Sequence, residues 1–128
     1  MLDFSNSKIL IVGDVMLDKY YFGKVDRISP EAPVPIVNIQ KEESRLGGAS
    51  NVANNIVSLG GHSLLCGVIG HDLFGKEIER ISRHKNIDTF LLKTSSPTIT
   101  KARIIGGKQQ IVRVDYEDKS ELNADNKK

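Results

Sequence analysis

A segment framed by two glycine pairs and two apolar runs constrains the fold of this chain most. Gly47-Gly48 precedes the segment and Gly60-Gly61 follows it, while its apolar residues recur at helical spacing. Glycine commonly follows the C-terminal end of a helix, so the helix is expected to end near Gly60. Residues 8–13 and 64–69, on either side, are apolar and read as strands. This order predicts a βαβ unit, with two parallel strands and a right-handed crossover.

The same patterns predict which sides of the elements are buried. Residues 8–13 form a continuous apolar run, which is typical of a strand covered on both faces. A second helix is expected to begin after a cap at Asp72 and to run to about residue 84. The residues expected to face inward are Val52, Ala53, Ile56 and Leu59 in the first helix and Leu73, Phe74, Ile78 and Ile81 in the second.

The remaining segments change in character. Three prolines within residues 30–35 exclude a helix there and predict an extended turn, followed by a short strand over residues 36–39. Residues 98–105 and 109–116 are rich in β-branched side chains and flank a glycine pair, which predicts a β-hairpin. Residues 117–128 are polar and lack periodicity, so they are expected to be a frayed tail or the start of a further segment.

The composition of the chain argues against several classes of function. The chain has 128 residues, 39% of them hydrophobic, and a net charge of +2, which fits one folded domain. Near-neutral charge argues against nucleic acid as a partner, and no apolar run is long enough to span a membrane. Cys66 is the single cysteine and has no histidine at metal-ligand spacing, so neither an internal disulfide nor a metal site is expected. A reducing cytoplasm is the expected location.

Two polar clusters are candidates for ligand binding. Gly47 and Gly48 would let a backbone approach a ligand closely, and Asn51 offers a donor and an acceptor suited to a sugar hydroxyl. The alternative is a tight loop in which the glycines serve only geometry. Asp14 and Asp18 follow the end of the first strand, where α/β sheets bind ligands. For either acid alone, a solvated loop residue or a helix cap is the better explanation, but the pair near a strand end and close to the glycine-rich helix start favours a ligand contact. Asp18 is the better candidate of the two.

The predicted hairpin carries a third candidate cluster. Lys101 and Arg103 are two residues apart and therefore share one face of the strand, and Arg113 on the returning strand is placed to join them. Guanidinium groups match phosphate oxygens well. An ordinary charged sheet face explains these residues equally well.

Several motifs together resemble the ribokinase-like (PfkB) carbohydrate kinase family. The pattern Gly47-Gly48-Ala49-x-Asn51-x-Ala53, six residues, Gly60, nine residues, Gly70 is similar to the N-terminal signature of that family. Residues 12–20, 27–35 and 97–101 resemble the branch whose members phosphorylate heptose 7-phosphate. One departure is Leu46, which stands where that branch has proline.

The resemblance implies an α/β fold with a ribokinase-like parallel-sheet core and a small β-lid, formed by elements at about residues 20–40 and 97–116. Residues 1–118 would be the N-terminal part of a kinase domain, because the later Gly-Ala-Gly-Asp segment that supplies the catalytic base and the ATP site is not found in this sequence. The parent protein would use ATP with Mg²⁺ to phosphorylate a heptose phosphate, and it would form a homodimer through the lid. This chain alone would be inactive, and the alternative is a non-catalytic sugar-phosphate-binding or dimerisation module. The residues implied to bind the substrate are Asp14, Asp18, Gly47, Gly48, Asn51, Lys101, Arg103 and Arg113.

Overall fold

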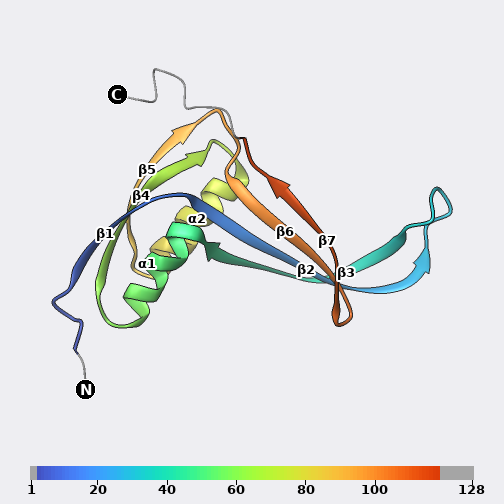
Figure 1. The fold of residues 1–128 in the computed structure, drawn as a ribbon, viewed down its shortest axis with the longest axis horizontal. Helices are drawn as coiled ribbons and strands as arrows, with labels where there is room; N and C mark the ends of the chain where they lie inside the picture. Colours follow the sequence, from blue (N-terminus) through green and yellow to red (C-terminus); the bar gives the residue numbers. More distant parts are fainter. Residues whose placement is uncertain (1–2, 119–128) are drawn as a thin grey trace.

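The computed structural model describes residues 3–118, which form two helices and seven strands (Figure 1). The predicted polar tail lies outside the described residues from residue 119 onward. None of the helices in the described part is long and apolar enough to cross a membrane. In chain order the elements are β1 (Lys8–Val12), β2 (Val15–Ile28), β3 (Pro35–Gly47), α1 (Gly48–Ser58), β4 (His62–Gly70), α2 (Leu73–His84), β5 (Asp88–Thr94), β6 (Ile99–Gly106) and β7 (Gln109–Tyr116).

The first sheet is parallel and has the strand order β1-β4-β5. Strand β1 pairs with β4 from Lys8↔His62 to Val12↔Cys66, and α1 connects the two strands, which confirms the predicted βαβ unit. Asp72 caps α2 as expected, because its side chain accepts a hydrogen bond from the Gly75 amide. Strand β5 was not predicted from the sequence. The α/β fold class is confirmed.

The second sheet, here called the lid, has the strand order β3-β2-β6-β7 and projects away from the parallel sheet (Figure 1). The predicted hairpin is present as β6 and β7. The other two strands differ from the prediction. Strand β2 is not predicted from the sequence, and β3 runs to Gly47 rather than ending near residue 39. Strand β2 contains two register irregularities, one of them beside Gly23, where the Asn38 carbonyl leaves no room for a side chain. These bulges interrupt the alternation that identifies a strand.

The hydrophobic core lies where the two helices meet both sheets. Leu17 of β2 and Leu46 of β3 bring the base of the lid into this core. The lid is therefore anchored to the α/β layer by apolar packing as well as by the chain itself. The core residues are Val15, Leu17, Leu46, Ala53, Leu65, Ile69, Ile78, Ile81 and Ile87.

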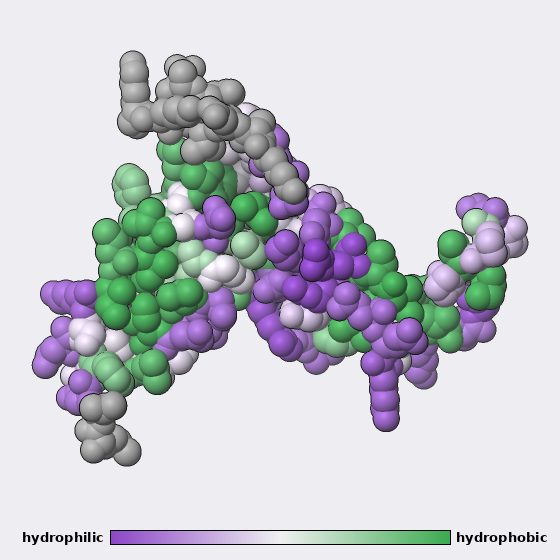
Figure 2. Space-filling model, in the orientation of Figure 1, coloured by the Kyte–Doolittle hydropathy of each residue, from purple (hydrophilic) through white to green (hydrophobic). Residues whose placement is uncertain are grey.

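Burial on the parallel sheet differs from the prediction. Residues 8–13 were expected to be covered on both faces, but both helices pack on one face only, and Val12 is 73% exposed. Phe90 on β5 lies on the same open face and is 74% exposed. Figure 2 shows hydrophobic residues gathered over this region of the molecule. In the helices the predicted stripes are wrong at three positions, because Val52, Leu59 and Leu73 are exposed.

Candidate functional site

The turn between β3 and α1 is held to β2 by hydrogen bonds. Gly48 adopts φ +54°, a backbone conformation that residues other than glycine rarely adopt. The Ala49 amide donates to the Asp14 carbonyl at 2.9 Å. The Ser50 hydroxyl, which is fully buried, donates to the carbonyls of Gly47 at 2.6 Å and Met16 at 3.1 Å. These contacts fix the N-terminal turn of α1 beside the start of β2.

Gly47 allows a carboxylate to lie against this turn. A Cβ at Gly47 would be 2.7 Å from Oδ2 of Asp18, so a side chain there would displace the Asp18 carboxylate. Asp18 itself is placed by the antiparallel pairing of β2 with β3, in which it stands opposite Arg45. The glycine at position 47 is therefore explained by the close approach of Asp18, and not only by the geometry of a tight loop.

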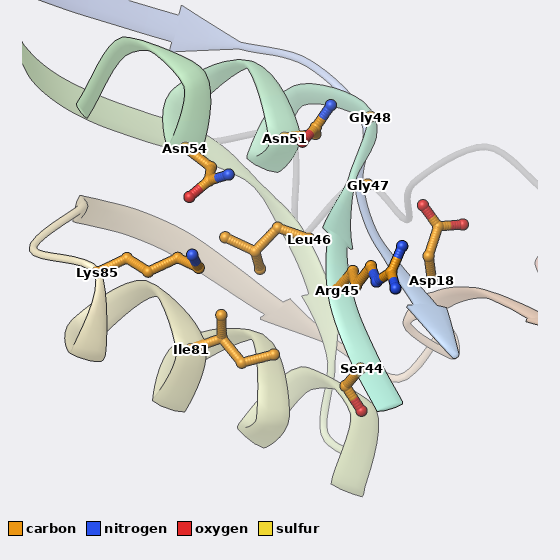
Figure 3. Close-up of a pocket in the computed structure, with 10 residues that line it drawn as sticks. All are labelled: Asp18, Ser44, Arg45, Leu46, Gly47, Gly48, Asn51, Asn54, Ile81 and Lys85. Atoms are coloured by element: carbon orange, nitrogen blue, oxygen red, sulfur yellow. The ribbon is translucent and has the colours of Figure 1, made fainter. Parts of the chain in front are cut away.

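A cavity of about 480 Å³ begins at this turn and runs between the two helices (Figure 3). Four of the eight predicted site residues, Asp18, Gly47, Gly48 and Asn51, line it together. Carboxylate, amide and backbone groups in one cavity offer both donors and acceptors, which suits a ligand with many hydroxyl groups. The other lining residues are Ser44, Arg45, Leu46, Asn54, Ile81 and Lys85.

Arg103 joins this site through an ion pair. Its Nη1 lies 2.6 Å from Oδ1 of Asp18, and both side chains are about one fifth exposed, at 21% and 22%. The hydrogen bond to Asp18 raises the pKa of the Arg103 guanidinium above its ordinary value. The pair holds the Asp18 carboxylate in place at the cavity wall, because a charge-assisted hydrogen bond has a well-defined geometry.

The other three predicted residues lie apart from the cavity wall. Arg113 contacts Asp115 through Nε at 2.9 Å and Nη2 at 3.0 Å, and the Lys101 ammonium lies 3.6 Å from the same carboxylate. Burial tends to raise the pKa of Asp115, but its contacts with Arg113 and Lys101 outweigh this and lower it. Asp14 has an exposed side chain, and its contribution to the site is the carbonyl that accepts from Ala49.

Sequence reasoning missed four polar residues of the cavity, namely Ser44, Arg45, Asn54 and Lys85. Asn54 lies three residues after Asn51 and so shares its side of α1, a spacing that was available in the sequence. Arg45 and Lys85 carried no such signal, because their positions depend on strand register and on the packing of α2. Within residues 3–118, His, Cys, Asp and Glu side chains form no group of three or more that could hold a metal ion.

A model of the pfkB family carbohydrate kinases matches residues 6–127. A relative from Bordetella bronchiseptica named D-beta-D-heptose 7-phosphate kinase is 50% identical over 118 residues, which are 91% of this chain and 38% of the relative. A bifunctional protein HldE from Helicobacter pylori strain P12 is 53% identical over 123 residues, which are 94% of this chain and 27% of that protein. The chain thus spans between about a quarter and two fifths of the length of these relatives.

Solved structures support the same architecture. A carbohydrate kinase from Agrobacterium tumefaciens superposes with a TM-score of 0.69 at 20% identity, covering 85% of this chain and 35% of that structure. A fructokinase from Xylella fastidiosa solved with bound ATP gives a TM-score of 0.63 at 22% identity, covering 87% and 33%. At these identities the likeness concerns the fold alone.

Proposed function

Because the chain belongs to the pfkB family of carbohydrate kinases, we propose that its full-length protein phosphorylates heptose 7-phosphate at the anomeric hydroxyl with ATP. The substrate is suggested by the heptose 7-phosphate kinase that is 50% identical to this chain. The observation that carries the proposal is the shared cavity of Asp18, Gly47, Gly48 and Asn51. We assign the protein to the cytoplasm, because a single cysteine fits a reducing compartment.

In this proposal the residues of the chain bind and orient the sugar. Asp18 accepts hydrogen bonds from two adjacent hydroxyls, and Asn51 donates to a third while its oxygen accepts. Backbone amides of the first turn of α1 meet oxygen atoms of the ligand next to Gly47 and Gly48. Asp14 is a weaker candidate, because its side chain does not line the cavity. The basic lid residues Lys101, Arg103 and Arg113 meet the phosphate that the substrate already carries.

ATP, bound with Mg²⁺, supplies the transferred phosphoryl group. The contribution of this chain is to hold the acceptor hydroxyl in position, since phosphoryl transfer depends on positioning and on stabilising charge. The test is a coupled assay of ADP release by the full-length protein with heptose 7-phosphate. Activity on a different sugar alone would refute the proposed substrate and leave the family assignment intact.

Asn51→Ala in the full-length protein is expected to weaken sugar binding by roughly 1–3 kcal/mol, because the sugar hydroxyl loses its partner. This corresponds to a loss of about fivefold to 150-fold in affinity. Isothermal titration calorimetry with heptose 7-phosphate measures it. Asn55→Ala is the matched control, because Asn55 is exposed on the same helix and does not line the cavity. Equal affinities for the two variants would remove Asn51 from the proposed site.

Arg113→Ala is expected to weaken binding of the phosphorylated heptose by about tenfold and to leave the unphosphorylated heptose unaffected. The reason is the loss of one charged hydrogen bond to phosphate at the lower end of the usual range of about 1.5–3 kcal/mol. Its control is Lys108→Ala, which removes an exposed positive charge from the turn between β6 and β7. Competition binding with both sugars measures the difference. A similar loss for both sugars would contradict a phosphate contact.

We also propose that two copies associate through the lid. Its strands β3 and β7 are edges, and a hollow of about 440 Å³ on its surface is lined by apolar side chains. Exposed strand edges and apolar hollows favour association with another chain.

The same edges and apolar hollow also favour the second candidate function, a non-catalytic sugar-phosphate-binding or dimerisation module. Calorimetric binding of heptose 7-phosphate without turnover in the full-length protein would favour that second function, and sedimentation velocity tests the dimer. The hollow is lined by Val34, Pro35, Val37, Ile39, Ile104, Ile111 and Val112.

A further inference from the structure

The guanidinium of Arg45 is a charged group on the cavity wall that the motifs do not account for. We propose that Arg45 recognises the phosphate of the substrate together with Arg103, and so determines specificity for a phosphorylated sugar. The inference rests on the proposed function, since it concerns the same cavity and the same class of ligand. Four observations carry it: the position of Arg45, its neighbours, its open hydrogen-bond donors and its contrast with Arg113.

Arg45 stands directly across from the carboxylate that begins the site. Asp18 and Arg45 are partners in the register of β2 and β3, so their side chains lie on the same face of the lid. Figure 3 shows the Arg45 side chain extending from β3 toward Asp18. Its pKa is raised chiefly by the hydrogen bond to Glu43, and the charge of Asp18 adds to this. A ligand held by Asp18 is therefore within the electrostatic reach of Arg45.

Tyr20 arranges the two guanidinium groups around the site. The Cζ atoms of Arg45 and Arg103 lie 4.8 Å and 5.2 Å from the centre of the Tyr20 ring. The ring is itself stacked on Phe22, with centres 6.1 Å apart and an angle of 10° between the planes. Stacking against an aromatic ring orients a guanidinium before a ligand arrives. Two arginines that are already ordered lose less entropy when they bind a phosphate.

Among the contacts within residues 3–118, both guanidinium groups have donors left for a ligand. The hydrogen bond of Arg45 to Glu43 uses Nη2, at 2.8 Å. Arg103 uses Nη1 for both Asp18 and the Lys101 carbonyl. An arginine has five N–H donors in a fixed fork, so each keeps nitrogens that match the oxygens of a phosphate. Of the lid arginines, these two therefore combine a position beside Asp18 with unused donors.

Arg113 differs from Arg45 in its contacts and in its position. Its Nε and Nη2 are both engaged by Asp115, and it does not line the cavity. A phosphate at the cavity would meet Arg45 without breaking such a two-point contact. This difference predicts that Arg45 contributes more to phosphate recognition than Arg113 does.

The chain offers a matched control for Arg45. Lys41 lies on the same strand and the same face, pairs with the same Glu43 at 2.5 Å, and also lies over a ring, that of Phe22, at 5.8 Å. Its side chain is 66% exposed, against 60% for Arg45. It lies farther along the lid and does not line the cavity. Lys41→Gln thus removes one positive charge and one Glu43 partner from outside the site.

The experiment compares Arg45→Gln, Arg45→Lys and Lys41→Gln in the full-length protein. Calorimetry gives the affinity of each for heptose 7-phosphate and for the same heptose without phosphate. Arg45→Gln is expected to lose about tenfold to 100-fold for the phosphorylated sugar, and less than about threefold for the other, because a charged hydrogen bond is lost. Arg45→Lys is expected to lose an intermediate amount, since the charge remains without the fork. Lys41→Gln is expected to match the wild type.

The outcomes separate the two proposals. If the wild type binds heptose 7-phosphate and Arg45→Gln binds it equally well, Arg45 has no role while the proposed function stands. A loss of the same size for both sugars would also overturn the phosphate contact and would indicate a structural role. If the wild type binds neither sugar, the proposed function fails and the inference fails with it. Circular dichroism and thermal unfolding establish that each variant is folded.

Discussion

Gly48→Ala is expected to destabilise the fold by about 3–4 kcal/mol, because it combines backbone strain with a steric clash. Gly48 has φ +54°, and a Cβ there would lie 2.5 Å from the carbonyl oxygen of Asp14. That oxygen already accepts the Ala49 amide at 2.9 Å, so moving it away would break a hydrogen bond at the start of α1. Urea unfolding followed by circular dichroism measures the loss.

Gly107→Ala is the matched control for this prediction. Gly107, in the turn between β6 and β7, has φ +63°, and a Cβ there would meet nothing within 4 Å. The substitution therefore introduces the strain of the left-handed conformation without a clash, which costs about 1–2 kcal/mol. The difference between the two variants isolates the contact with Asp14. Equal losses would mean that backbone conformation alone requires glycine at position 48.

Asp72→Ala is expected to destabilise the fold by about 2–4 kcal/mol, because it removes a helix cap and leaves buried donors unpaired. Oδ1 of Asp72 accepts from the Gly75 amide at 2.8 Å and from the Thr98 hydroxyl at 2.7 Å, and Oδ2 accepts from the Thr98 amide at 2.8 Å. Thr98 in turn accepts from the Gly70 amide at 2.8 Å. The carboxylate thus joins the end of β4, the start of α2 and the start of β6. Urea unfolding measures the loss.

The control for this variant is Asp3→Ala, because Asp3 also accepts from a backbone amide, that of Ser5 at 2.9 Å, but is exposed. Its loss is expected to be below about 0.5 kcal/mol. A loss of similar size for Asp72→Ala would show that the junction at Thr98 contributes little to stability.

The Asp72 carboxylate also makes stability depend on pH. Partial burial raises its pKa, but the hydrogen bonds from Thr98 and Gly75 outweigh this, so the pKa lies below the ordinary value of 3.8. The stabilisation is therefore complete well above pH 3.8 and is lost as the pH falls through the lowered pKa. Unfolding free energies of the wild type and of Asp72→Asn, measured between about pH 2 and 6, are expected to converge at the acid end. A gap between them that did not change with pH would contradict this account.

Local patterns predicted the elements whose partners are near in the sequence. The glycine pairs bounded α1, Asp72 began α2, and the hairpin of β6 and β7 followed from its turn and its β-branched strands. In each case the signal and the structure it specifies lie within about a dozen residues, so backbone conformation and capping decide the outcome. The parallel pairing of β1 with β4 also followed, because the crossover rule leaves one arrangement for a strand-helix-strand order.

Long-range pairing explains what was missed in the fold. Strand β2 pairs with β3 on one side and with β6 on the other, and β6 lies more than 70 residues later in the chain. The bulges of β2 interrupt the alternation of apolar and polar residues that identifies a strand. Its mixture of charged and aromatic residues is typical of a loop. The exposure of Val12 and Val52 has a related cause, since an apolar side chain is buried only where another element covers it.

The residues of the functional site also separate into those placed by local sequence and those placed by long-range packing. The sequence by itself determined that Gly47, Gly48 and Asn51 share one helix start and that Asp18 follows the first strand, because these relations are local. Only the tertiary structure decided that Asp18 packs on Gly47, that Arg103 reaches Asp18 and Arg113 is held by Asp115, and that Arg45 lines the cavity. The physical reason is strand register, because a shift of one residue moves every side chain of a strand to the opposite face, and register is set by packing across the whole lid.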